Sequence, residues 1–280
     1  HIGRVWRLLY WAMPYDFARG IWPNVRSALI WDPSAITTYL TGSILFVIVA
    51  LIPDLAVIRD RTTGIRHQIY SILALGWRGT PRQWKLQIIS GFLLSALLLP
   101  VFVSVHSIVS WDFAAAISVE GWHSTIFAPY FVIGAVHSGV SGVVTVLILM
   151  RWLYKWDAYI RPEHFDALGK LLIAIATGWF YFFALEVIFS LYSLEGQEIA
   201  MRELQVFHWP FAPLFIVFII TGYLFPVPMW LFKKVRRNVG WMLITTLSVN
   251  VGMWIERFLI IIPGLARKGP LTFDWSTYHP

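Results

Sequence analysis

Residues 106–142 read HSIVSWDFAAAISVEGWHSTIFAPYFVIGAVHSGVSG and lie between two long apolar runs. The stretch carries three histidines, one aspartate and one glutamate, but no lysine or arginine. Ionisable groups at the edge of a bilayer are costly unless they are paired, hydrated or used in function. We therefore interpret the stretch as a candidate functional segment at one face of a membrane, with the rest of the chain as its scaffold.

The composition indicates an integral membrane protein. Of the 280 residues, 58% are hydrophobic and 13% are charged, whereas soluble domains carry about 25% charged residues. Sixteen tryptophans and eleven tyrosines suit the belts at membrane interfaces. The chain has no cysteine, which excludes a disulfide or a thiolate-held cluster within it. The net charge of +7 fits membrane topology and does not indicate a nucleic-acid partner.

Six apolar runs are long enough to cross a bilayer as helices, which takes roughly 20 residues. Continuous apolar runs, rather than alternation, predict helices and not a barrel. The fold class is therefore all-α, a polytopic transmembrane helix bundle. Residues 69–77 are too few to span and predict an interfacial helix, and the acidic residues 195–203 are expected to form a loop. The predicted spans are 38–58, 86–109, 124–152, 168–194, 211–232 and 239–262.

Lysine and arginine are distributed unevenly between the two sides of this topology. Loops 59–85, 151–170 and 233–238 hold fourteen of them, and the segments on the opposite side hold seven. Cytoplasmic loops carry the excess of these residues. The first set is therefore predicted to be cytoplasmic, and residues 1–32, 111–123 and 195–203 to face outward.

Several ionisable residues gather at the ends of apolar runs on the predicted outer side. A quinol releases two protons and two electrons when it is oxidised. Its site needs an apolar slot and a proton acceptor near each hydroxyl. The alternative is that the aspartates cap helix starts, and Asp32 before Pro33 fits that pattern. The residues in question are His1, Asp32, Asp112, Glu120 and His123.

A di-haem site is a further alternative. His123 and His137 are fourteen residues apart, so they would lie about 40° apart around one helix. A four-helix haem site needs a second helix with a matching pair, but His106 and His208 each stand alone in their spans. We therefore do not expect this chain to hold haem. Small residues around His137 instead predict close helix packing.

Three ionisable residues fall deeper within the predicted spans. Asp54, Glu186 and Glu256 suit a proton relay, but a structural ion pair is an equal alternative, and Arg257 directly follows Glu256. Glu186 has no obvious partner within its own span, which favours it as the relay candidate. The chain contains no phosphate-binding glycine loop, no HExxH motif and no nucleophile elbow, which excludes a soluble-type kinase or hydrolase.

The motifs of the chain resemble those of a known membrane family. Residues 104–113 (SVHSIVSWDF) and 121–132 (GWHSTIFAPYFV) are similar to the NrfD, or polysulfide-reductase, membrane subunits. Residues 1–6 (HIGRVW), 29–32 (LIWD) and 253–258 (MWIERF) look like the versions found in bacterial alternative complex III, a quinol-oxidising complex. The resemblance extends over nearly the whole chain.

The resemblance implies an architecture. Such subunits are similar to proteins of about ten helices, with two four-helix bundles and flanking helices, of which this chain would be a piece. Residues 1–109 would belong to the N-terminal bundle and carry quinol-site elements. Residues 110–280 would form the C-terminal four-helix bundle. The chain would be one of the two paralogous NrfD-type proteins of the complex, the C-type or the F-type.

The resemblance also implies a function. The C-type paralogue would oxidise menaquinol or ubiquinol near the outer face of the bacterial inner (cytoplasmic) membrane. By motif, the quinol site would comprise His1, Asp32 and Asp112, with His106 nearby; His1 would act as general base for one proton and an aspartate for the other. Electrons would pass to an iron–sulfur/molybdopterin-like subunit and on to multihaem cytochromes c. The other partner would be the paralogous NrfD-type protein, and this chain itself would hold no haem or iron–sulfur cluster.

A second hypothesis is that the chain is the F-type paralogue, an anchor that conducts protons and oxidises no quinol. Two departures from the expected C-type pattern leave this choice open: Ala128 stands at a position where proline is common, and residues 194–201 differ. A secondary transporter with paired broken helices ranks last. The proton-transfer candidates are Asp54, Glu120, His123, His137, Glu186, Glu256 and Arg257.

Overall fold

The computed structural model describes residues 13–16, 18–117, 119 and 121–265. Within this part of the chain the regular elements are helices, and no strand is present. Six helices are long and apolar enough to cross a membrane. The prediction of an all-α, multi-pass membrane protein is therefore confirmed. The chain divides into two compact units, residues 1–109 and 110–280.

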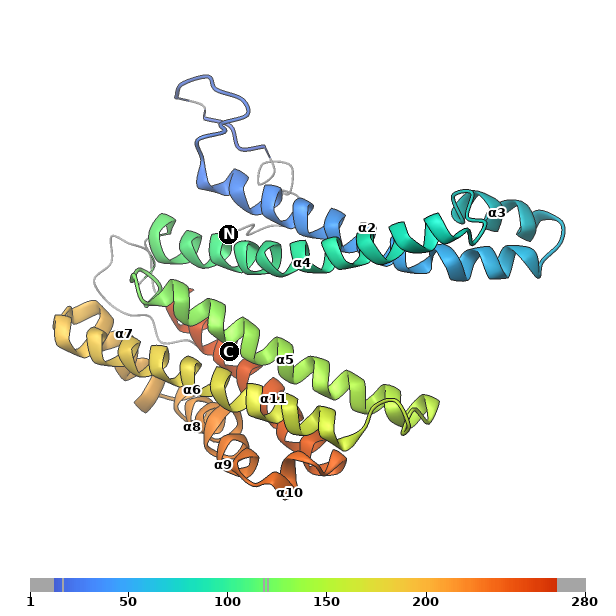
Figure 1. The fold of residues 1–280 in the computed structure, drawn as a ribbon. Coiled ribbons are helices and arrows are strands. Elements are labelled where there is room, and N and C mark those ends of the chain that lie inside the picture. The colour runs from blue at the N-terminus through green and yellow to red at the C-terminus, as the bar shows by residue number, and fades with distance from the viewer. Residues whose placement is uncertain (1–12, 17, 118, 120, 266–280) are drawn as a thin grey trace. The chain divides into compact units, whose positions relative to one another are not determined.

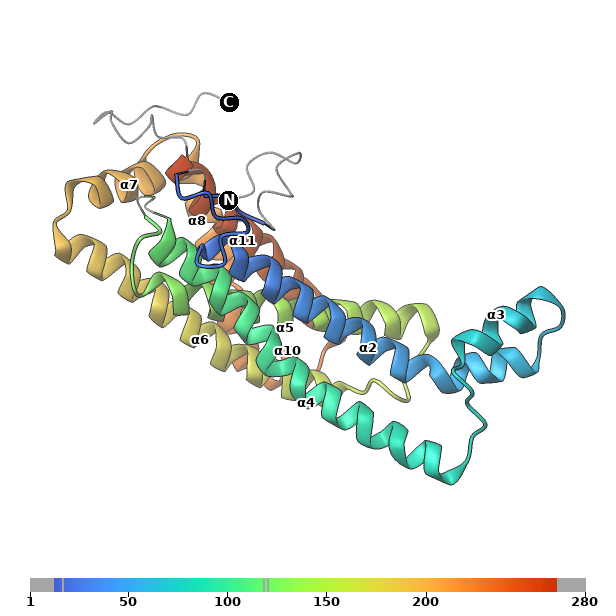
Figure 2. The ribbon, with the colours of Figure 1, turned by 90° about the horizontal axis from the view of Figure 1, so that it is seen from above.

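Unit 1 is built on two long helices, α2 (Trp31–Asp60) and α4 (Pro81–Trp111), which Figure 2 shows from above. A short helix η2 (Ala28–Ile30) precedes α2, and α3 (Ile65–Leu73) follows it. The predicted interfacial helix thus lies a few residues earlier than expected. Arg59 at the end of α2 donates to the carbonyl of Trp77 at 2.9 Å, which ties the segment after α3 to α2.

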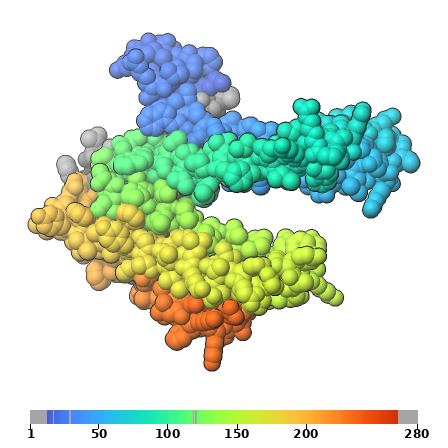
Figure 3. Space-filling model, in the orientation of Figure 1, coloured from blue at the N-terminus to red at the C-terminus, as the bar shows by residue number. Residues whose placement is uncertain are grey.

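Unit 2 contains four spanning segments, α5, α6, the series α8–η4–α9, and α11, which run alongside one another in Figure 1. The π-helix η3 continues directly from α4, and a second π-helix, η4, interrupts the third span. The surface of α6 forms much of the visible face of this unit in Figure 3. The elements are η3 (Asp112–Ala116), α5 (Phe127–Tyr154), α6 (Pro162–Ser193), α7 (Gly196–Phe207), α8 (Phe211–Ile219), η4 (Ile220–Leu224), α9 (Pro226–Leu231), α10 (Lys233–Arg236) and α11 (Val239–Leu265).

Helix α7 corrects the sequence prediction, which expected a loop over residues 195–203. The segment is short and only half apolar, so it gives no signal of a membrane span. It nevertheless buries Met201 and Gln205 against the bundle, and Glu203 faces outward. Gly121, at φ +82°, permits this packing, because a Cβ there would lie 3.1 Å from Met201 Cγ. Tertiary contact therefore decides the helical state of α7.

Glycines set the distances between helices in unit 2. A Cβ at Gly252 of α11 would lie 2.5 Å from the backbone nitrogen of Gly222 in η4, and one at Gly134 of α5 would lie 2.6 Å from Arg257 Nη2. Gly139 and Gly142 meet nothing within 4 Å among the described residues. The expected close packing around His137 therefore holds at Gly134 and not along the whole stretch.

Proline interrupts the hydrogen bonding of several of these helices. It has no N–H and so leaves the carbonyl four residues earlier without its helical donor, which is costly where no water can replace it. In unit 1, Pro53 lies inside α2, and the carbonyl of Val49 accepts a hydrogen bond from Gln87 of α4. A side chain of the neighbouring helix thus replaces the missing donor.

The same arrangement recurs at the π-helix of unit 2. Pro226 leaves the carbonyl of Gly222 without a helical donor, and Nε2 of the fully buried His137 lies 3.3 Å from that oxygen. Since a carbonyl only accepts, Nε2 must carry the proton. His137 was predicted as a proton-transfer candidate, but its geometry is that of a structural donor.

A third case occurs near the end of α11. Pro263 leaves the carbonyl of Leu259 without a helical donor, and Gln205 Nε2 of α7 donates to it at 2.9 Å. Beside it, Trp122 Nε1 donates to the carbonyl of Ile260 at 2.6 Å. These two bonds attach α7 and the segment before α5 to the same turn of α11.

We expect Gly252→Ala to destabilise unit 2, because the added methyl group would overlap the backbone of η4. Overpacking of this kind costs about 1–3 kcal/mol. The matched control is Gly178→Ala, whose Cβ would lie at an ordinary 3.7 Å from Ile133 Cδ1 and which should be neutral or stabilising. Equal thermal unfolding of the two variants in detergent would contradict this packing.

We expect His137→Leu to loosen the α8–η4–α9 segment, because the carbonyl of Gly222 would lose its donor at a cost of about 1–3 kcal/mol. His137→Gln retains an N–H group and should lose less. Hydrogen exchange of backbone amides, followed by mass spectrometry, measures the effect. Equal exchange across this segment in both variants would show that the hydrogen bond does not matter.

Candidate functional site

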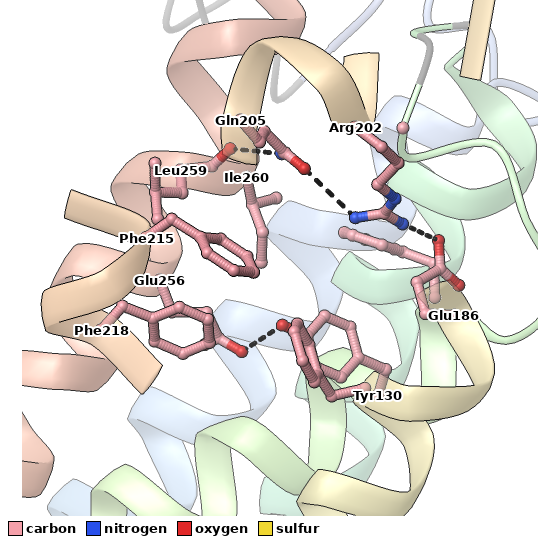
Figure 4. A pocket seen from close by; sticks show the side chains of 12 residues that line it. Tyr130, Glu186, Arg202, Gln205, Phe215, Phe218, Glu256, Leu259 and Ile260 are labelled. Atoms are coloured by element: carbon pink, nitrogen blue, oxygen red, sulfur yellow. Dashed lines mark hydrogen bonds and ion pairs between the residues drawn. The ribbon is translucent and has the colours of Figure 1, made fainter. Parts of the chain in front are cut away.

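A small cavity lies inside unit 2 between α5, α6, α7, α8 and α11 (Figure 4). Its volume is about 30 Å³, and a water molecule needs only about 10–15 Å³. The wall combines aromatic rings with two carboxylates that come from different helices. The polar lining residues are Tyr130, Glu186, Arg202, Gln205 and Glu256.

Glu256 of α11 lies on one side of this cavity. Its Oε1 accepts hydrogen bonds from the hydroxyl of Tyr130 and, at 2.9 Å, from Trp179 Nε1. The Nε of Arg257 is 3.6 Å from Oε2. Arg257 in turn donates to the carbonyl of Phe131 at 3.1 Å and lies 4.0 Å from the centre of that ring. Glu256 is therefore a buried carboxylate with neutral donors on one oxygen and a cation beside the other.

Glu186 of α6 lies on the other side. Arg202 Nη2 of α7 is 3.1 Å from its Oε1, and the hydroxyl of Ser124 donates to its Oε2 at 2.8 Å. The partner of Glu186 is thus an arginine from another element. This pairing was not predicted, because only the span of Glu186 itself was considered and residues 195–203 were expected to form a loop.

Arg202 makes two further contacts. Its Nη1 donates to Gln205 Oε1 at 3.2 Å, and its Nε is 3.4 Å from the hydroxyl of Ser190. Figure 4 shows the chain of bonds that runs from Leu259 through Gln205 and Arg202 to Glu186. The guanidinium is therefore oriented by three side chains of α6 and α7.

A second, open hollow of about 490 Å³ adjoins the same carboxylate. It lies at the end of the bundle where α6 meets α7, and Glu195 and Glu198 are part of its acidic wall. Glu186 lines both this hollow and the inner cavity. We call this hollow the acidic groove. Glu186 is therefore placed to exchange protons with both spaces.

Two of the predicted quinol-site residues are buried near the start of a helix. Asp32 lies in the first turn of α2, and Asp112 lies at the start of η3. The N-cap residues are Ile30 and Trp111, so neither aspartate occupies an N-cap position. His1 lies outside the described residues.

The remaining candidates are dispersed. His106 Nδ1 is 3.0 Å from the carbonyl of Phe102 in its own helix. Asp54 is exposed on α2, and His123 is exposed before α5 begins. The expectation that His123 and His137 share a helix is therefore wrong. Glu120 lies outside the described residues, and within the described part no group of three or more His, Asp or Glu residues is arranged for a metal ion.

Four residues of the cavity and its surroundings, Tyr130, Ser124, Arg202 and Gln205, were not predicted from the sequence. Arg202 carried a usable signal, because it is the lone basic residue between 195 and 207. The others are common residue types whose roles depend on the fold. Their importance follows from the contacts of the two carboxylates.

Comparison with known proteins agrees with this architecture. A protein of Halobacterium salinarum described as a putative dimethyl sulfoxide reductase membrane subunit, of type C, is 26% identical over 151 residues, which make up 54% of this chain and 32% of that protein. The chain therefore matches about a third of the length of this relative. The family model "Polysulphide reductase, NrfD" matches residues 1–268. Since this match covers nearly the whole chain, the protein belongs to the NrfD family.

Proposed function

We propose that this protein is the membrane-embedded subunit of a redox complex and that it oxidises quinol at the predicted outer face of a bacterial inner membrane. The observation that carries the proposal is the burial of Asp112 where α4 passes into the π-helix η3. π-helical turns are frequent at functional sites, and an ionisable residue within a span is a functional candidate. Family membership and the relative, which is named as a membrane subunit of a reductase, support the same conclusion.

In this proposal the quinol is menaquinol or ubiquinol. Asp112 accepts one of its protons, and Asp32 with His1 serves the other hydroxyl. The two electrons leave to an iron–sulfur/molybdopterin-type partner subunit and from there to multihaem cytochromes c. A paralogous NrfD-type protein is the other membrane-embedded part of the complex, which is of the alternative complex III type.

We expect Asp112→Asn to lower quinol:acceptor turnover about a hundredfold or more, because the amide cannot accept a proton and general-base groups contribute about that much. The measurement uses the assembled complex with a soluble quinol. Asp157→Asn is the matched control, since this residue is 66% exposed and its ion pair contributes little. Unchanged turnover in Asp112→Asn would remove Asp112 from the mechanism.

A second function, proton conduction through unit 2, is favoured by the position of Glu186 between the acidic groove and the inner cavity. In this proposal protons move between the groove and Glu256 through Glu186 and water in the cavity. Tyr130 bonds to Glu256 and would extend the path. His137 and Asp54 are not part of it, because one donates to a backbone carbonyl and the other lies in unit 1.

We expect Glu186→Gln to lower the number of protons released per electron in vesicles while electron transfer continues at a similar rate. The amide keeps the shape of the side chain and its bond to Ser124, but it cannot carry a proton. Glu203→Gln on α7 is the control, because Glu203 is 62% exposed. An unaltered proton-to-electron ratio in Glu186→Gln would refute the path.

A further inference from the structure

We infer that Arg202 is a positioning residue that controls proton exchange at Glu186 by holding it as a carboxylate between the acidic groove and the inner cavity. The inference rests on the proton path proposed above and names the group that regulates it. Three observations carry it: the bonds at both oxygens of Glu186, the anchoring of Arg202, and the attachment of α7 to the bundle.

Both oxygens of Glu186 are engaged in the observed state. Oε1 is 3.1 Å from Arg202 Nη2, and Oε2 accepts from Ser124 at 2.8 Å. The Glu186 side chain is only 7% exposed. A buried carboxylate with a guanidinium and a hydroxyl donor is stabilised in its charged form, whereas the same group without a cation takes up a proton. Arg202 therefore decides whether Glu186 carries a proton.

Arg202 is held by neighbours that do not themselves line both spaces. Gln205 accepts from Nη1 at 3.2 Å, and the Ser190 hydroxyl lies 3.4 Å from Nε. The bond from Gln205 to the carbonyl of Leu259 is available because Pro263 removes the helical donor. The proline in α11 thus helps to orient the arginine that faces Glu186.

The carrier of Arg202 is a short helix with few attachments. α7 has twelve residues, of which Met201 and Gln205 are buried. Leu194, with a positive φ of 53°, precedes it, and His208 follows it. A shift of α7 would move Arg202 away from Glu186 and open exchange with the groove. The charged and titratable groups around Glu186 are Arg202 on α7, Glu195 and Glu198 in the groove, and Tyr130 and Glu256 across the cavity.

The test uses dicyclohexylcarbodiimide, a hydrophobic reagent that reacts with protonated carboxyl groups. The acid proton moves to one reagent nitrogen while the carboxyl oxygen bonds the central carbon. The O-acylisourea then rearranges to a stable N-acylurea that retains all atoms of both partners. Mass spectrometry of the intact membrane complex after digestion reports the labelling rate at Glu186. The open groove of about 490 Å³ admits the reagent.

In the unaltered protein we expect slow labelling of Glu186 at neutral pH and faster labelling as the pH falls. Arg202→Gln should label at least about tenfold faster at neutral pH, with little dependence on pH, because breaking a buried ion pair costs at least that much. Arg202→Lys retains the positive charge and should restore slow, pH-dependent labelling. Glu203→Gln, on the exposed side of the same helix, should behave as the unaltered protein, and Glu256 serves as an internal reference.

Equal labelling of Glu186 in the unaltered protein and in Arg202→Gln would overturn the inference, as would a failure of Arg202→Lys to slow the reaction. The proton path is tested separately by proton release in Glu186→Gln. If that variant releases protons normally while Arg202→Gln labels rapidly, the path is wrong but the hold of Arg202 on Glu186 stands. If proton release falls while labelling is unaffected by Arg202, the path stands and the control by Arg202 is wrong.

Discussion

The structure depends on a constraint of the membrane interior, where each backbone carbonyl must find a donor within the protein. Proline inside a span violates it by removing one N–H, and here the gap is filled from a neighbouring helix. Gln87 serves α2 in unit 1, and His137 and Gln205 serve the third span and α11 in unit 2. Each repair also joins two elements, so these polar side chains stabilise both the backbone and the packing. The prolines consequently act as points of attachment between helices.

This constraint separates structural polar groups from those free to do chemistry. A side chain that donates to an otherwise unsatisfied carbonyl cannot change protonation or orientation without exposing that carbonyl, which applies to His137 and Gln205. Glu186 and Glu256 have no such duty, because they accept bonds from side chains only. They also face a cavity large enough for water. The two carboxylates are therefore the groups of unit 2 whose proton content can vary at small structural cost.

The sequence predicted the spans well and the contacts poorly. Long apolar runs determine where helices cross, so all six spans were placed within a few residues, and Glu186 and Glu256 were recognised as buried. The partners of Glu186 were missed because Arg202 lies on α7, whose helical state depends on burial of Met201 and Gln205. The pairing of His123 with His137 was wrong because α5 begins at Phe127, and helix starts depend on local bonds such as that from the Phe127 amide to Ser124 at 3.1 Å. Spacing along the chain cannot reveal contacts of this kind.

The two carboxylates differ in a way that identifies Glu186 as the one that exchanges protons. Each lies beside one arginine, so the charges balance when both are ionised, and a proton on either would leave a buried cation uncompensated. At Glu256 that state is opposed twice: Tyr130 and Trp179 also donate to the carboxylate, and Arg257 is fixed by the carbonyl and ring of Phe131. At Glu186 the balancing cation sits on α7, a short helix beside an open groove. Removal of that cation requires movement of one small element, whereas removal of Arg257 would disrupt a spanning helix. Control of proton exchange is therefore placed most economically at Arg202.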